Sequence, residues 1–151
     1  MTKTKVDHEQ EYVIAVLAPR FKVDYNTVMK NIIHSLGAVE NIADRNCNHF
    51  VFLHDGVTSG TTGYVIETVN KISPSARLFK DPRSISARKL PLDIEMYGKR
   101  SHWHWLDELI KLKPDLIVVF DPGDLAVVQY AQRLGKEHGI QVDVYKAKKE
   151  S

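Results

Sequence analysis

A buried strand that leads directly into a helix is predicted by the stretch Lys113-Pro114-Asp115-Leu116-Ile117-Val118-Val119-Phe120-Asp121-Pro122-Gly123-Asp124. Its five consecutive apolar residues lie between a proline and an Asp-Pro-Gly-Asp turn, which is typical of a strand covered on both faces of a parallel sheet. Apolar residues then recur at helical spacing from Val127 to Leu134, and Asp124 is placed to cap that helix. We therefore expect the turn at the carboxyl edge of the sheet, where open α/β folds bind ligands.

The same order of strand, turn and helix recurs along the chain. Further strands are predicted at 12–18, 49–54 and 140–145, with a brief one at 76–79, and further helices at 24–37, from within 56–63 to 72, and from about 101 to 113. Between Lys80 and Arg100 we find no regular period, so this stretch is either a functional loop or hides an unrecognised element. Five strands alternating with four helices predict an α/β fold, a Rossmann-like three-layer sandwich with a mainly parallel sheet.

Composition narrows the class of protein. The 151 residues, 43% of them hydrophobic, predict one domain at 11–147, preceded by a flexible arm at 1–10 and followed by a basic tail at 148–151. A net charge of +2 without a basic stripe makes nucleic-acid binding unexpected, and Cys47 alone forms no internal disulfide. No apolar run reaches membrane-spanning length and residues 1–11 are polar, so we expect a cytoplasmic protein without membrane contact.

A glycine- and hydroxyl-rich segment, residues 56–63, follows the strand at 49–54 and opens a helix. Free amides and hydroxyls at a helix start can hold a phosphate. The ligand-binding candidates in this segment are Gly56, Thr58, Ser59, Gly60, Thr61 and Thr62. The alternative is an ordinary connection whose hydroxyls cap the helix. The segment is not a P-loop, because the Gly-Lys-Ser/Thr ending is missing.

Further candidates fall at the ends of the first strand and of the strand before Asp121. Arg20 can pair with a phosphate or stack on a base, its alternative being an exposed turn arginine. Asp121 and Gly123 lie in the Asp-Pro-Gly-Asp turn, where carboxylates favour ribose hydroxyls or a base edge over a phosphate. Asp124 is more simply a helix cap.

Histidines and aromatic residues gather at 101–105. His102 and His104 are two apart on a predicted helix and point to nearly opposite sides, so we expect no metal site. The tryptophans between and after them are interpreted as core or interface residues, one of which can stack on a purine. His54 and Asp55 end a strand and are candidates for acid–base work, with ordinary turn residues as the alternative.

Four segments, in this order and spacing, resemble the SLOG superfamily, the Rossmann-like group that includes the Lonely Guy phosphoribohydrolases, DprA and small stand-alone domains of the YspA type. They are Ala18-Pro19-Arg20, where the family often has Gly-Ser/Thr-Arg, then His54 to Gly63, Tyr97-Gly98, and Pro114 to Phe120 with its glycine turn. The resemblance covers most of the chain. It implies a Rossmann-like fold that binds a nucleotide or a nucleotide-derived molecule.

The chain departs from this family at two places. YspA-like members commonly carry an Arg-Asn pair before the third long helix, whereas this chain has Ser-His-Trp-His-Trp at 101–105. The Lonely Guy enzymes use Pro-Gly-Gly-x-Gly-Thr-x-x-Glu after the strand, and residues 122–129 lack the second glycine, the Gly-Thr pair and the glutamate. The resemblance therefore implies binding rather than the phosphoribohydrolase reaction.

Three functions follow as hypotheses. The leading one is binding of a nucleotide-like small molecule at the carboxyl edge of the sheet, without a cofactor. The second is hydrolysis of a nucleotide N-glycosidic bond, with Asp121 or Asp55 as the catalytic carboxylate in place of the missing glutamate. The third is a protein–protein interaction module on a ligand-free scaffold, of the kind carried by phages and mobile elements.

Self-association is a further expectation. The helix predicted from about 101 to 113 carries two apolar stripes, one with Trp103 and one with Trp105, and one sheet-facing side needs only one of them. We therefore predict a homodimer through this helix and the connection before it. The alternative is that the connection at 80–100 covers both stripes within the monomer.

Overall fold

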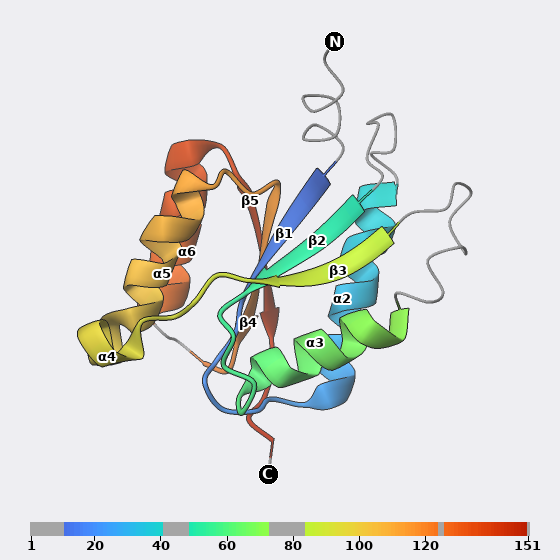
Figure 1. Ribbon diagram of the computed structural model, residues 1–151, viewed down its shortest axis with the longest axis horizontal. Helices are drawn as coiled ribbons and strands as arrows, with labels where there is room; N and C mark the ends of the chain where they lie inside the picture. Colours follow the sequence, from blue (N-terminus) through green and yellow to red (C-terminus); the bar gives the residue numbers. More distant parts are fainter. Residues whose placement is uncertain (1–10, 41–48, 73–83, 124–125, 151) are drawn as a thin grey trace.

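The computed structural model describes residues 11–40, 49–72, 84–123 and 126–150. They form an α/β fold in which a five-stranded parallel sheet is flanked by helices on both faces (Figure 1). The strands are β1 Glu11–Leu17, β2 His49–His54, β3 Ser84–Lys89, β4 Leu116–Asp121 and β5 Gln141–Lys146. The helices are α2 Tyr25–Glu40, α3 Thr61–Ile72, α4 Ile94–Tyr97, the 3-10 turn η2 Gly98–Arg100, α5 Ser101–Lys111 and α6 Ala126–His138. The predicted Rossmann-like three-layer architecture is confirmed.

The strand order is β3-β2-β1-β4-β5, and every pairing is parallel. From β1 the chain builds outward through β2 and β3, and it then returns to the other side of β1 to place β4 and β5. The loops that follow β1 and β4 consequently leave the sheet toward opposite faces. This divergence is the topological switch point, the usual place for a ligand in an open α/β sheet.

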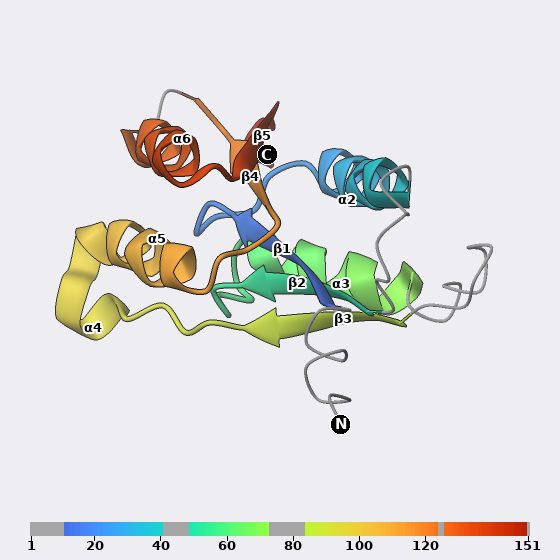
Figure 2. The same cartoon turned by 90° about the horizontal axis from the view of Figure 1, so that it is seen from above.

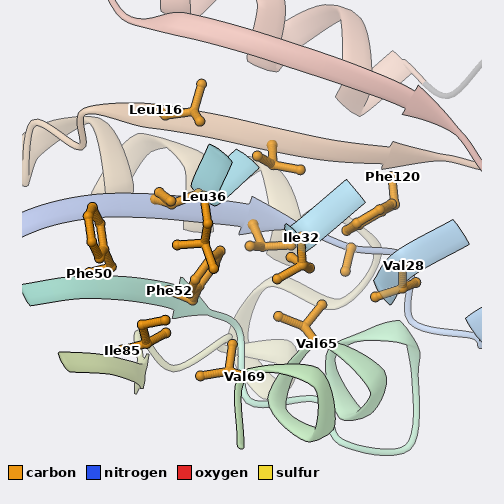
Figure 3. Packing of buried hydrophobic residues seen from close by; sticks show 14 of the residues in the cluster. Val28, Ile32, Leu36, Phe50, Phe52, Val65, Val69, Ile85, Leu116 and Phe120 are labelled. Atoms are coloured by element: carbon orange, nitrogen blue, oxygen red, sulfur yellow. The ribbon is translucent and has the colours of Figure 1, made fainter. Parts of the chain in front are cut away.

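Two apolar clusters cover the two faces of the sheet. Alternate residues of β1 enter different clusters, as the two-residue period of a strand requires: Ile14 and Val16 face α2 and α3, while Ala15 and Leu17 face α5 and α6. Figure 2 shows these helix pairs on opposite sides of the sheet. Figure 3 shows the first cluster, where Ile32 of α2 and Val65 of α3 lie close to strand residues such as Phe52. Parallel strands of this kind are buried on both faces, which is why β4 has a continuous apolar run.

The third strand lies inside the connection for which the sequence showed no period. β3 pairs with β2 from Ser84 to Lys89, and only Ile85 of this strand is buried among the residues whose side chains are described. An edge strand with two serines, an arginine and a lysine carries little hydrophobic signal. The short helix α4 and the turn η2 follow it, and Asp93 caps α4 by accepting a hydrogen bond from the Met96 amide at 3.0 Å. The strand predicted at 76–79 lies outside the described residues.

Most of the two apolar stripes predicted on α5 are buried within the chain. Trp105, Leu106, Leu109 and Ile110 all belong to the cluster on this face of the sheet. The Trp105 indole also donates a hydrogen bond to the Leu90 carbonyl at 2.7 Å, so the connection after β3 covers this side of the helix. Trp103 is half-buried against the Tyr130 ring of α6. Only part of the expected surface therefore remains exposed, and the homodimer stays a prediction.

The C-terminal residues pair with the segment that precedes α2. Lys149 forms an antiparallel bridge with Val23, the Asp24 amide donates to the Lys148 carbonyl at 3.0 Å, and the Glu150 amide donates to the Lys22 carbonyl at 2.8 Å. The described part of the predicted tail is thus attached to the β1–α2 loop rather than freely solvated.

Candidate functional site

A cavity of about 190 Å³ opens at the switch point between β1 and β4. Its lining comes from the end of β1 and the following loop, from the end of β4, and from the first turns of α5 and α6: Leu17, Ala18, Pro19, Arg20, Phe21, His102, Phe120, Val127 and Val128. An engineered protein cavity of about 150 Å³ can hold benzene, and pockets for drug-sized ligands begin at about 300 Å³. The volume of this cavity lies between these two values. Its size therefore suits one planar ring rather than a whole nucleotide.

Two polar side chains, Arg20 and His102, line this otherwise apolar cavity. Arg20 is exposed in the loop that follows β1. Its place beyond the first strand agrees with the sequence-based expectation. His102 lies in the first turn of α5 and is half-buried. A bound molecule thus meets a permanent positive charge at the mouth of the cavity and an imidazole at its wall.

His102 is held by Asp55, the residue that follows β2. The Nε2 atom of His102 lies 2.9 Å from Oδ2 of Asp55, and the Asp55 residue is only 2% exposed. The two meet because α5 returns the chain from the far edge of the sheet and begins at the carboxyl edge, where β2 ends. The result is a buried carboxylate bonded to an imidazole that lines a cavity.

The other oxygen of the Asp55 carboxylate is also engaged. Oδ1 accepts hydrogen bonds from the Thr62 hydroxyl at 2.6 Å and from the Val57 amide at 2.9 Å. Burial by itself would raise the pKa of Asp55, but the hydrogen bonds from His102, Thr62 and Val57 outweigh burial, and the pKa lies below its ordinary value. Asp55 is therefore a carboxylate at neutral pH, and it acts on a cavity ligand only through His102.

An anionic Asp55 also sets the tautomer of His102. The carboxylate can only accept, so Nε2 of the imidazole carries the hydrogen of this bond. In the described part of the chain no hydrogen bond involves Nδ1 of His102. Nδ1 is consequently the ring nitrogen left to contact a molecule in the cavity.

The glycine-rich segment, residues 56–63, packs closely against the β1–α2 loop. A Cβ added to Gly60 would lie 2.5 Å from the Arg20 carbonyl oxygen of that loop. Within the segment itself, a Cβ added to Gly63 would lie 2.3 Å from the Thr58 carbonyl oxygen. The Thr61 amide donates to the carbonyls of Pro19 and Phe21, both at 3.2 Å. Here glycine allows two backbones to approach more closely than any side chain would permit.

These contacts favour the packing interpretation over a phosphate cradle for part of this segment. The Thr61 hydroxyl donates to the Phe21 carbonyl at 2.6 Å and accepts from the Val23 amide at 3.1 Å, and the Thr62 hydroxyl donates to Asp55. Both threonines are buried, whereas Thr58 and Ser59 are exposed. Gly56 turns the chain with φ +79°. The segment positions Arg20 and Asp55, and ligand contact at Thr58 and Ser59 stays a prediction.

Asp121 and Gly123 form a turn at the end of β4. Oδ1 of Asp121 accepts from the Gly123 amide at 2.9 Å, and the Asp121 carbonyl accepts from the Ala147 amide at 2.9 Å. Gly123 has φ +149°, a conformation that favours glycine. Neither residue lines the cavity, so their contact with a ligand stays a prediction. Asp124 lies outside the described residues.

His54 and Asp55, the two candidates for acid–base work at the end of β2, have different hydrogen-bond partners. Nδ1 of His54 accepts from the Gly56 amide at 3.1 Å, and the residue is buried. The pKa of His54 is lower than its ordinary value, mainly because burial disfavours the charged imidazole. The negative charge of Asp55 raises this pKa and the positive charge of Lys89 lowers it. The partner of Asp55 is His102, which sequence reasoning considered only as a metal ligand. A usable signal existed, because a helix that precedes a central parallel strand begins at the carboxyl edge of the sheet.

The two histidines of α5 point to different partners. His102 bonds Asp55, while the His104 ring stacks on Tyr97 of α4 with centroids 3.9 Å apart. Within the described ranges, no group of three or more His, Cys, Asp or Glu side chains is arranged to hold a metal ion.

Comparison with models of known protein families found none that matches this chain, and comparison with curated protein sequences found no match. In the part of the chain that the structure describes, every helix is too short or too polar to cross a membrane.

Proposed function

We propose that this protein binds a nucleotide or a nucleotide-derived small molecule in the cavity at the switch point. The observation that carries the proposal is an apolar cavity of about 190 Å³ whose polar lining is Arg20 and His102, placed where the loops after β1 and β4 diverge. The ring of the ligand enters the cavity, and its phosphate remains at the mouth beside the guanidinium of Arg20. The resemblance to SLOG domains supports the same ligand class by analogy.

The N-glycosidic hydrolase has less support from the geometry. Such enzymes place a carboxylate beside the scissile bond. Both oxygens of Asp55 are bonded inside the protein, and Asp121 does not line the cavity. The interaction module stays an alternative, because Met96 on α4 and Leu112 after α5 are exposed apolar residues.

Calorimetric titration with nucleoside mono-, di- and triphosphates, cyclic nucleotides and ADP-ribose tests the proposal. We expect a dissociation constant below the millimolar range for at least one of them. Arg20→Gln should weaken that binding about tenfold or more, since it removes a charged hydrogen bond to phosphate. Arg133→Gln, an exposed arginine of α6 that does not line the cavity, is the matched control.

A second variant tests the location of the ring. Val127 is a half-buried residue of the cavity wall, so Val127→Trp should fill the cavity and prevent binding without removing a core side chain. Gln129→Trp, at an exposed position of the same helix, should bind as the wild type does. Absence of binding at millimolar concentration by the folded wild-type protein would contradict the proposal.

A further inference from the structure

We propose that His102, oriented by Asp55, is a general base that activates water to hydrolyse a phosphate ester of the bound nucleotide. This inference rests on the proposed function, because it needs the ring of the substrate in the cavity. It goes further in assigning a reaction and a proton acceptor to a site that otherwise only binds.

Orientation of the imidazole is the first requirement, and three elements provide it. Asp55 follows β2, Thr62 lies in the first turn of α3, and His102 lies in the first turn of α5. The Thr62 hydroxyl and the Val57 amide fix one carboxylate oxygen, and Nε2 of His102 binds the other at 2.9 Å. A base whose ring is held by a third group in this way is the arrangement that activates nucleophiles in many enzymes.

The protonation state is the second requirement. Because Asp55 remains ionised at neutral pH, it holds the Nε2 hydrogen and stabilises the positive charge that develops when Nδ1 takes up a proton. Asp55 does not touch the substrate, so it is a positioning residue. His102 is the residue that contacts the reacting water.

The reaction balances with water as the only other reactant. An O–H bond of water breaks and its proton moves to Nδ1 of His102, while the water oxygen forms a bond to phosphorus. The bond between phosphorus and the leaving ester oxygen breaks on the side opposite the attacking water, so that oxygen takes up a proton from solvent while His102 returns its proton to solvent. Arg20, at the same cavity, pairs with the negative charge on the phosphoryl oxygens.

The lining of the cavity favours a phosphate ester over a glycoside. Arg20 is a cation that suits a phosphoryl group, whereas none of the lining residues carries a carboxylate to stabilise an oxocarbenium ion. The shared chemistry, attack of water on phosphorus, applies to monoesters and cyclic diesters alike. The products distinguish them.

The full chain is incubated in the presence of magnesium chloride with two sets of substrates, nucleoside 5′-monophosphates and nucleoside 2′,3′-cyclic monophosphates. The products are separated by chromatography. A nucleoside from the first set or a ring-opened monophosphate from the second supports the proposal. Free base from either set would mean glycoside cleavage and would overturn it. No product above the protein-free rate would overturn it as well.

Variants assign the roles. His102→Gln should lower kcat by about 10²- to 10⁴-fold, the usual contribution of a general base. Asp55→Asn should lower kcat more than it raises KM and should shift the limb of the pH profile that reports the base. His104→Gln, whose side chain stacks on Tyr97 outside the cavity, is the control and should retain wild-type turnover. Equal turnover by wild type and His102→Gln would refute the assignment.

A rescue measurement guards against misfolding. Circular dichroism and thermal unfolding show whether each variant folds, and added imidazole should restore part of the turnover of His102→Gly by occupying the vacated space. A folded His102→Gly protein that imidazole does not rescue counts against a general base. Calorimetry on His102→Gln separates the two proposals: nucleotide binding without His102-dependent turnover leaves the proposed function intact and rejects hydrolysis alone.

Discussion

Asp55 Oδ2 accepts a hydrogen bond from Nε2 of His102 at 2.9 Å, although 47 positions of the sequence separate the two residues. The bond joins the end of β2 to the start of α5 across the carboxyl edge of the sheet. It turns a buried carboxylate and a cavity-lining imidazole into one unit, and much of what the site can do depends on it.

The pH dependence of stability should report the ionisation of Asp55. Its pKa is lower in the folded protein than its ordinary value, so the folded state binds this proton more weakly than the unfolded chain. The contribution of the carboxylate is therefore present above about pH 4 and is lost as the pH falls through the folded-state pKa. Urea unfolding should show that Asp55→Asn loses less stability than the wild type between pH 7 and pH 3.

Asp93→Asn is the matched control for that measurement. Asp93 is an exposed carboxylate whose capping role an asparagine can take over. This variant should keep the wild-type pH dependence. If the unfolding free energy of Asp55→Asn fell with pH as steeply as that of the wild type, the role assigned to the buried carboxylate would be contradicted.

Ser101 precedes His102 in the chain, and its hydroxyl is buried without a hydrogen-bond partner among the described residues. Because no bond is lost, Ser101→Ala should change the free energy of unfolding by no more than about 0.5 kcal/mol, or should increase it. Chemical denaturation gives this value. A loss of about 2 kcal/mol would reveal a partner for the hydroxyl.

Gly60 should tolerate no side chain. A Cβ there would lie 2.5 Å from the Arg20 carbonyl oxygen, so Gly60→Ala should push the β1–α2 loop away and cost about 1–3 kcal/mol. The same substitution should weaken nucleotide binding, since the displaced loop carries Arg20. Ser59→Ala, at the exposed neighbouring position, should remain within about 0.5 kcal/mol of the wild type in the same denaturation experiment.

Removal of the C-terminal residues should loosen the same loop. A chain that ends at Ala147 loses the bonds from the Asp24 amide to Lys148 and from the Glu150 amide to Lys22, each contributing about 1 kcal/mol. We expect a lower melting temperature and faster amide exchange at residues 22–24. Lys148→Ala keeps the backbone bonds and should behave as the wild type, and an unchanged melting temperature of the shortened chain would contradict the attachment.

The exposed part of the α5 region gives the homodimer prediction a direct test. Light scattering after size exclusion should give twice the chain mass of 17.2 kDa if the homodimer forms. Leu112 is 56% exposed beside α5, so Leu112→Glu should shift the mass toward the monomer. Asn70→Glu, on the exposed side of α3, is the control. A wild-type mass of one chain at micromolar concentration would end this prediction.

Local patterns were sufficient for most of the architecture. The apolar run at 116–120 predicted a central strand because burial on both faces leaves no position for a polar residue. Helical spacing likewise predicted α2, α3 and α6, whose inward faces repeat every three to four residues. β3 was missed because an edge strand needs few buried residues, and the alternation of Ile85 and Ala87 with polar neighbours is too short to mark a strand.

The sequence by itself therefore determined the fold class and the place of Arg20 at the carboxyl edge of the sheet, because both follow from local periodicity and the direction of parallel strands. Only the tertiary structure decided that Asp55 bonds His102 and that Gly60 meets the backbone of Arg20. Those two contacts depend on how α3 and α5 are placed against the sheet. Close packing of side chains over the whole core sets that placement, and no local pattern encodes it.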